Sequence, residues 1–170
     1  MLIYNAYVYD PQGSSMKLAL ILGSVLLSAC AAYSGSGLQP GTSTLAEVVR
    51  AMGEPAMRWQ DSDGSVQLSY PRGAAPQSFM VRIGPDGKLQ SIRNVLVPEV
   101  TAKIIAGMSK DDVLRLIGPP IANRTTYFKA RDELAWDWRY EERLGELAYF
   151  SVLFDATRGT VRSTLVIPDP

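Results

Sequence analysis

The chain has 170 residues, and its 17 lysines and arginines balance 17 aspartates and glutamates. This neutral balance gives no basic surface of the kind that nucleic-acid-binding domains carry, so we expect no nucleic-acid partner. The sequence contains no histidine, which removes the commonest general base and the commonest metal ligand. Its single cysteine excludes an internal disulfide and any zinc site built from paired cysteines.

The N-terminal part of the sequence has the layout of a secretory signal peptide. Lys17 follows Met16, residues 18–27 are almost wholly apolar, and residues 27–30 read Leu-Ser-Ala-Cys. The apolar run is too short to cross a bilayer, which takes about 20 residues. Residues 1–15 contain an aspartate and no lysine or arginine, so we expect translation to start at Met16.

Residues 27–30 resemble the lipobox of bacterial lipoproteins. In that class the cysteine thiol receives diacylglycerol, the chain is cut before the cysteine, and the new amino end is acylated. The resemblance predicts that residues 1–29 are a signal peptide and that Cys30 is lipidated. An aspartate after the cysteine commonly keeps such proteins at the inner membrane, so Ala31 favours the outer membrane. Two or more acyl chains anchor a protein stably.

Two segments of the remaining chain match each other without gaps, 65 positions apart (44 to 109). Residues 44–55 read TLAEVVRAMGEP, and residues 109–120 read SKDDVLRLIGPP. Both place a hydroxyl residue three positions before an acidic residue, which is the pattern of a helix capping box. Apolar residues follow at helical spacing, and Gly53 and Gly118 suit a residue of positive φ that ends a helix. The sequence predicts a short helix in each segment.

Each predicted helix is followed first by a segment in which apolar and polar residues alternate and then by two apolar runs on either side of a turn. These segments are 66–70, 79–83 and 89–95 in the first copy and 134–140, 149–154 and 161–167 in the second. A period of two predicts half-buried strands of an antiparallel sheet, and Pro-Asp-Gly at residues 85–87 predicts a hairpin turn. We expect an α+β fold of two tandem units, each with one or more short helices on a three-stranded antiparallel meander.

The two units are expected to cover residues 38–97 and 98–170. Residues 98–107 begin with proline and end with glycine, which predicts an additional short helix in the second unit. The first unit has no such helix. Residues 30–37 stand in its place, and their glycines and serines predict a lipidated, flexible tether.

The second unit resembles the SmpA/OmlA (BamE) family of outer-membrane lipoproteins. The resemblance rests on Gly107-Met108-Ser109, Val113, Ile117-Gly118-x-Pro120 and the later Trp138-x-Tyr140. It covers residues 98–170 and, more weakly, 38–97. It implies two helices on a three-stranded sheet and, for BamE itself, a place in the machinery that inserts β-barrel proteins into the outer membrane. BamE has one copy of the unit, whereas β-lactamase inhibitory protein is a tandem of a similar one.

The sequence contains three pairs of neighbouring carboxylates, at 111–112, 132–133 and 141–142. General acid–base catalysis needs two carboxylates that converge in a cleft, whereas sequence neighbours on a helix or strand point apart. We therefore interpret these pairs as solvated charges. No nucleophile or phosphate-binding motif accompanies them, so we expect no enzymatic activity, no cofactor and no metal.

The large rings of the second unit are the candidate partner-binding residues, together with two arginines beside them. These residues are Tyr127, Phe128, Trp136, Trp138, Arg139, Tyr140 and Arg143. In one interpretation residues 136, 138 and 140 belong to the core beneath the helices. In a second, part of the set lies on an open sheet face and binds a protein, because Trp, Tyr and Arg dominate interface hot spots. In a third, residues 127–129 contact lipid headgroups.

These observations predict a non-catalytic lipoprotein that is anchored in the outer membrane and faces the periplasm. The leading hypothesis is a scaffold or accessory subunit that binds an envelope protein, with the β-barrel assembly machinery as one candidate, in outer-membrane assembly or integrity. The alternative is a periplasmic enzyme inhibitor that binds its target through a concave surface made by both sheets, as the resemblance to β-lactamase inhibitory protein implies.

Overall fold

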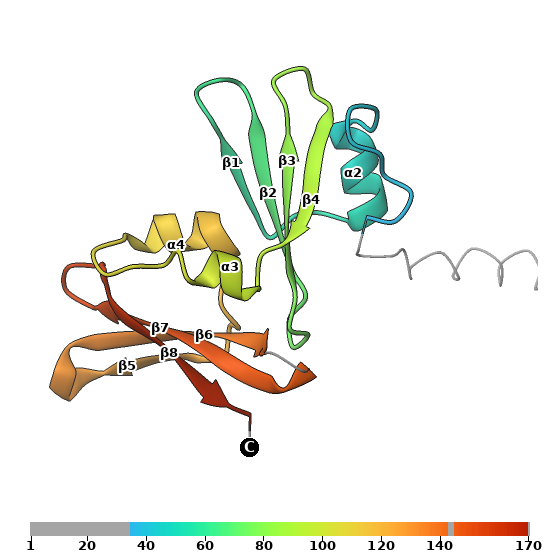
Figure 1. The fold of residues 1–170 in the computed structure, drawn as a ribbon. Coiled ribbons are helices and arrows are strands. Elements are labelled where there is room, and N and C mark those ends of the chain that lie inside the picture. Colours follow the sequence, from blue (N-terminus) through green and yellow to red (C-terminus); the bar gives the residue numbers. More distant parts are fainter. Residues whose placement is uncertain (1–34, 143–144, 170) are drawn as a thin grey trace, which may run out of the picture. The chain divides into compact units, whose positions relative to one another are not determined.

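The computed structural model of the chain describes residues 35–142 and 145–169 (Figure 1). The predicted signal peptide and Cys30 lie outside these residues. The described residues form two antiparallel four-stranded sheets and a few short helices, so the fold is α+β. No helix among them is long and apolar enough to span a membrane.

The first half of the described chain contains one helix and sheet 1. Its elements are α2 (Leu45–Met52), β1 (Met57–Gln60), β2 (Val66–Pro71), β3 (Ser78–Ile83) and β4 (Leu89–Asn94). The strands pair in chain order, and α2 lies beside the sheet in Figure 1. The apolar stripe of the helix explains this placement, because Val48 and Met52 form one buried cluster with Leu68, Tyr70 and Val81.

The second half repeats this order with one additional helix. Its elements are α3 (Pro98–Thr101), α4 (Lys110–Ile117), β5 (Thr125–Phe128), the 3₁₀ turn η1 (Lys129–Arg131), β6 (Glu133–Glu141), β7 (Leu147–Asp155) and β8 (Val161–Pro168). The four strands form sheet 2, again in chain order. Val113 and Ile117 of α4 are fully buried in a cluster with Trp138, Phe150 and Val152.

Both predicted helices of the repeated motif are confirmed, together with their capping boxes. Thr44 and Ser109 are the N-caps, and each side chain accepts a hydrogen bond from the backbone N–H three residues on. The carboxylates of Glu47 and Asp112 accept in return from the N-cap N–H groups, at 2.7 and 2.9 Å. These bonds satisfy amide donors that the first helical turn would otherwise leave without partners.

The prediction of three-stranded meanders is wrong, because each sheet has a fourth strand at its start. The missed strands are β1 and β5, which have four residues each. All four residues of β5 are exposed, so the strand has no buried face to impose an alternating pattern. The helix predicted at 98–107 is also shorter than expected. It ends at Thr101, and the chain turns so that the Gly107 N–H donates to the Val161 carbonyl.

The two halves also share individual hydrogen bonds. The Tyr70 hydroxyl donates to the Gly53 carbonyl at 3.1 Å, and Trp138 Nε1 donates to the Gly118 carbonyl at 3.2 Å. An isolated bridge joins Thr44 to Lys88 in the first half, and another joins Ser109 to Thr160 in the second. In both halves, therefore, an aromatic side chain of the second strand fixes the end of the helix, and a bridge to the last hairpin fixes its beginning.

We call the side of each sheet that faces away from its own helix (α2 or α4) its outer face. The outer face of sheet 1 is partly covered, because α4 lies against its β1 and β2 side, whereas Arg82 on the same face has a side chain 45% exposed. Gln67 Nε2 donates to the Arg115 carbonyl at 2.5 Å, and Trp59 Nε1 donates to Asp111 at 3.3 Å. Met80 belongs to the same buried cluster as α4. Helix α4 thus packs between the outer face of sheet 1 and the inner face of sheet 2.

Candidate functional site

The aromatic residues singled out in the sequence do not form one surface. Trp138 and Tyr140 are only 2% and 5% exposed, so both belong to the core and neither meets a partner in this fold. Trp136 is half-buried on the same inner face, where its ring meets that of Phe154 edge-on at 4.7 Å between centroids. Alternation along β6 explains this, since residues two apart share a face.

The remaining predicted site residues lie elsewhere. Phe128 and Arg139 are on the outer face of sheet 2, and Tyr127 is exposed on the edge strand β5. The Tyr127 hydroxyl donates to the Asp132 carboxylate at 3.0 Å, and this bond raises the pKa of Tyr127. Arg143 lies outside the described residues.

The outer face of sheet 2 carries a shallow hollow of about 210 Å³. All of its lining residues come from sheet 2 and η1. They are Thr126, Phe128, Arg131, Ala135, Asp137, Ser151, Leu153, Leu165 and Ile167. Leu165 and Ile167 remain 38% and 45% exposed although they are large and apolar. Among the residues that the structure describes, no helix contributes to this hollow.

The corresponding hollow on sheet 1 is bordered by helices. It measures about 230 Å³, and its sheet residues are joined by Val100 of α3 and by Arg115 and Leu116 of α4. Strand pairing shows that the two hollows match. On sheet 2, Tyr149 of β7 pairs with Ile167 of β8. The corresponding residues of sheet 1 are Ser78 and Val95, and the Val95 N–H donates to the Ser78 carbonyl. The same part of the sheet is therefore covered in the first half and uncovered in the second.

The two faces differ in composition as well as in cover. Matching positions of the two sheets carry Arg82 and Leu153 on the third strands, and Arg93 and Leu165 on the fourth. Val95 is 7% exposed beneath α4, whereas its counterpart Ile167 is open to solvent. Sheet 2 thus presents the more apolar face to solvent, contrary to the usual tendency of apolar residues to be buried.

Four arginine–carboxylate pairs surround this hollow. They are Arg124–Asp137, Arg131–Glu133, Arg139–Asp169 and Arg162–Asp155. In every pair the guanidinium is more exposed than the carboxylate, most strongly in Arg131–Glu133, where the side chains are 60% and 11% exposed. Hydrogen bonds from the Arg158 backbone and the Arg162 side chain lower the pKa of Asp155. An approaching molecule therefore meets guanidinium groups above buried carboxylates.

Aromatic rings hold several of these guanidiniums in place. The Arg124 guanidinium carbon lies 3.6 Å from the centroid of the Tyr149 ring, and that of Arg131 lies 4.6 Å from the Phe128 ring. Cation–π contacts of this kind leave the guanidinium edge available for hydrogen bonds. The Ser151 hydroxyl donates to Asp137 at 2.7 Å, so the centre of the face is also ordered.

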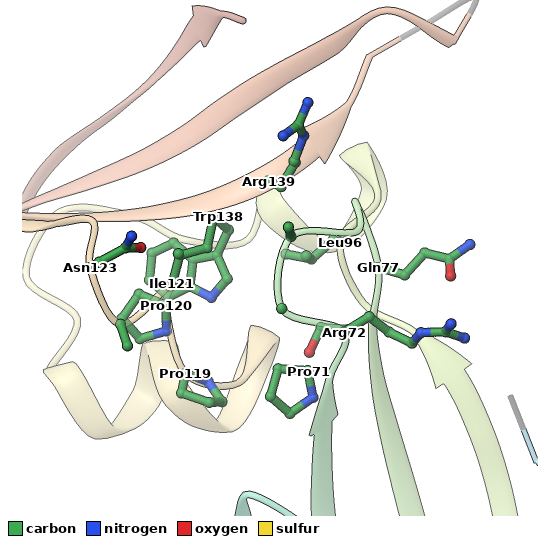
Figure 2. A pocket seen from close by; sticks show the side chains of 14 residues that line it. Pro71, Arg72, Gln77, Leu96, Pro119, Pro120, Ile121, Asn123, Trp138 and Arg139 are labelled. Carbon is green, nitrogen blue, oxygen red and sulfur yellow. The ribbon is translucent and has the colours of Figure 1, made fainter. Parts of the chain in front are cut away.

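A larger cavity of about 520 Å³ lies where the β2–β3 turn meets residues 119–123. Figure 2 shows Pro119, Pro120 and Ile121 along it, with the Trp138 ring beside them and the Arg139 side chain pointing away from that ring. None of the described residues that line it is a carboxylate or a cysteine. The cavity therefore has the space for a ligand but not the converging acids of a hydrolytic site.

The carboxylate pairs at 111–112 and 132–133 have structural partners, whereas Glu141 and Glu142 are exposed. Asp112 caps α4, and Asp111 lies 3.2 Å from the Arg115 Nε. Hydrogen bonds from the Thr157 side chain, the Tyr127 hydroxyl and the Thr157 N–H lower the pKa of Asp132, and Glu133 pairs with Arg131. Among the described residues no group of three or more aspartates, glutamates or cysteines has the arrangement of a metal site.

Sequence analysis gave no indication of the hollow on sheet 2. Its most exposed apolar residues lie in the segment Thr164-Leu165-Val166-Ile167, where apolar side chains occupy both faces of one strand. An apolar run on an edge strand near a chain end is the signal that would have pointed to it.

Comparison with known proteins identifies no relative. No protein-family model matches the sequence, and no curated protein matches it. One solved structure, an extracellular protein containing a SCP domain from Bacillus anthracis, aligns at 10% identity with a TM-score of 0.28. The alignment covers 99% of this chain, which spans half the length of that protein. A similarity this weak supports no conclusion about fold or function.

Proposed function

We propose that this chain is a non-catalytic lipoprotein of the bacterial outer membrane that binds another envelope protein from the periplasmic face. The observation that carries the binding role is the outer face of sheet 2. It combines exposed Leu165 and Ile167 with ordered guanidiniums, and its counterpart on sheet 1 is used for packing. Apolar residues framed by arginine are typical of protein interfaces.

The proposal also covers the architecture, which we interpret as a duplication. We infer two copies of one BamE-like unit, supported by the repeated order of elements, the two capping boxes and the matched bonds to Gly53 and Gly118. The matching residues are helix caps and core positions, so they transfer no functional site from that family. Membrane attachment rests on the lipobox around Cys30 alone.

The alternative proposal, an enzyme inhibitor, needs a concave surface made by both sheets, and α4 lies against part of the outer face of sheet 1. Trp59 and Gln67 of that face are hydrogen-bonded to the helix. This arrangement reduces the surface that the two sheets could share in an inhibitor. Partner binding through sheet 2 alone is the simpler proposal.

Affinity purification from detergent-extracted membranes tests the proposal. The full chain is expected to retain a stoichiometric envelope protein, and Leu165→Glu is expected to lose it by placing a charge in the hollow. Ile105→Glu is the matched control, because Ile105 is 62% exposed and does not line that hollow. Barrel-assembly components as partners would support an assembly role. Equal recovery with both variants would contradict the proposed surface, and a hydrolase as the main partner would favour an inhibitor.

A further inference from the structure

The molecule contains an internal example of how this type of face is covered. On sheet 1 the outer face is partly covered by α4, an eight-residue helix that places Leu116 at the border of the hollow and extends Arg115 toward Asp61 at 2.9 Å. The sheet 2 hollow has the same position on the same strands, and nothing among the described residues fills it. A helix therefore has the shape that this kind of twisted four-stranded face accommodates.

We infer that the outer face of sheet 2 binds an amphipathic helix of the partner protein, in the place that α4 takes on sheet 1. The inference rests on the proposed function and specifies its partner. The helix presents apolar side chains to Leu153, Leu165 and Ile167, with aspartate or glutamate residues beside that apolar stripe.

The charge preference follows from the ion pairs around the hollow. The side chains of Glu133, Asp137 and Asp155 are only 11–17% exposed, less than those of the arginines that pair with them. The guanidiniums of Arg131 and Arg124 are 60% and 42% exposed. Acidic side chains on the incoming helix add charge-assisted hydrogen bonds to these groups, whereas basic side chains meet like charge.

The chain's own α2 is a poor occupant, which argues against a second copy. At the position of Leu116 it has Ala51, so its outward side lacks the large apolar group, and at the position of Asp111 it has Ala46. Its exposed acid, Glu47, is engaged in the capping box with Thr44. A head-to-tail contact of this kind would also leave a free face at each end and continue into a filament. A helix with larger apolar residues fits the hollow better.

Photo-crosslinking in the cells that express the full chain tests this inference. Benzoylphenylalanine replaces Phe128, Leu153 or Leu165 in turn, with Ile105 as the control position, and captured residues are located by mass spectrometry. We expect the three positions to capture one protein segment at residues three or four apart, with acidic residues beside them. The captured segment, made as a synthetic peptide, should gain helicity on binding. Its variant with glutamines for glutamates should bind about 10-fold more weakly.

Other patterns would overturn the inference in distinguishable ways. Captured residues at a spacing of two would show a strand added to the edge of β8. Capture of this chain itself would show self-association, and capture of lipid alone would show a membrane contact. A protein captured only from Ile105 would preserve the proposed function and refute the helix site. Capture of no protein from any position would refute both.

Discussion

The contact between α4 and sheet 1 is open to a sharp test at the two glycines that end the repeated helices. Gly53 and Gly118 have nearly the same backbone, with φ of 83° and 79° and ψ of −172° and −174°. This region is essentially restricted to glycine, so an alanine at either position costs about 1–3 kcal/mol of the free energy of unfolding. The surroundings of the two residues differ completely.

A Cβ on Gly53 meets no atom within 4 Å, whereas a Cβ on Gly118 clashes with the Ser69 hydroxyl and lies 3.0 Å from Ser78 Oγ. The second contact set crosses from α4 to sheet 1. Overpacking of this kind costs about a further 1–3 kcal/mol. We therefore expect Gly118→Ala to destabilise the protein more than Gly53→Ala by that amount.

Urea unfolding followed by tryptophan fluorescence measures the free energy of unfolding of each variant. The comparison requires that both variants have the same m-value, the slope of this free energy against urea concentration. Ser69→Ala provides the rescue, because the Ser69 hydroxyl is buried and has no hydrogen-bond partner among the described residues. Its removal alone should cost little, and it should recover part of the loss in Gly118→Ala. Equal destabilisation by the two glycine variants, with no coupling to Ser69, would refute the packing of α4 against sheet 1.

Three further predictions concern matched features of the two halves and the anchor. Tyr70→Phe and Trp138→Phe each remove the donor to a helix-ending carbonyl, so each should lower the free energy of unfolding by about 1–3 kcal/mol; a loss confined to one variant would contradict the shared design. Backbone and side-chain hydrogen bonds from the N-caps lower the pKa of Glu47 and Asp112, so their stabilisation is present above the unfolded-state pKa of about 4 and is lost as the pH falls through the lower folded value. Glu47→Gln and Asp112→Asn should therefore reduce the loss of stability that the wild type shows as the pH falls below about 4, measured by thermal unfolding. An unchanged loss would show that the caps do not contribute to the pH dependence. Globomycin, which blocks lipoprotein signal peptidase, should cause the precursor of the wild type to accumulate, and Cys30→Ser should incorporate no labelled palmitate; mature protein formed normally under the drug would contradict lipidation.

The repeated helices were predictable because their signals are local. A hydroxyl residue, an acid three positions later and a terminal glycine specify both ends of α2 and α4 within twelve residues of sequence. The central strands were also predictable, since apolar and polar residues alternate along β2 and β6 and apolar runs mark β3 and β7.

The features that sequence analysis missed depend on contacts between distant segments. Strand β5 is exposed along its whole length and is held by pairing with β6 rather than by burial. The double role of α4 was equally hidden, because Arg115 looks like a solvated charge until Asp61 and Trp59 are placed beside it. The one local sign was that Asp111 and Leu116 replace the alanines that α2 carries at the same positions.

The candidate site was predicted only in part for the same reason. Phe128 and Arg139 were expected at an interface and lie on the open face, whereas Trp138 and Tyr140 are core residues. A strand with period two divides its aromatic residues between two faces, and the sequence does not state which face a helix will cover. Only the packing of α4 decides that sheet 1 is covered and sheet 2 is open.

The most direct test of the account compares matched positions on the two outer faces by thiol labelling. Val95→Cys and Ile167→Cys are made separately in a Cys30→Ser background, and the labelling rate of each folded protein is measured against its unfolded form. We predict that the thiol introduced by Ile167→Cys reacts at nearly its unfolded rate. The thiol introduced by Val95→Cys should react about 100-fold more slowly than its own unfolded form, since Val95 is 7% exposed in the buried cluster that includes Val113 and Ile117 of α4. Equal rates at the two positions would contradict the claim that sheet 2 alone presents an open face to a partner.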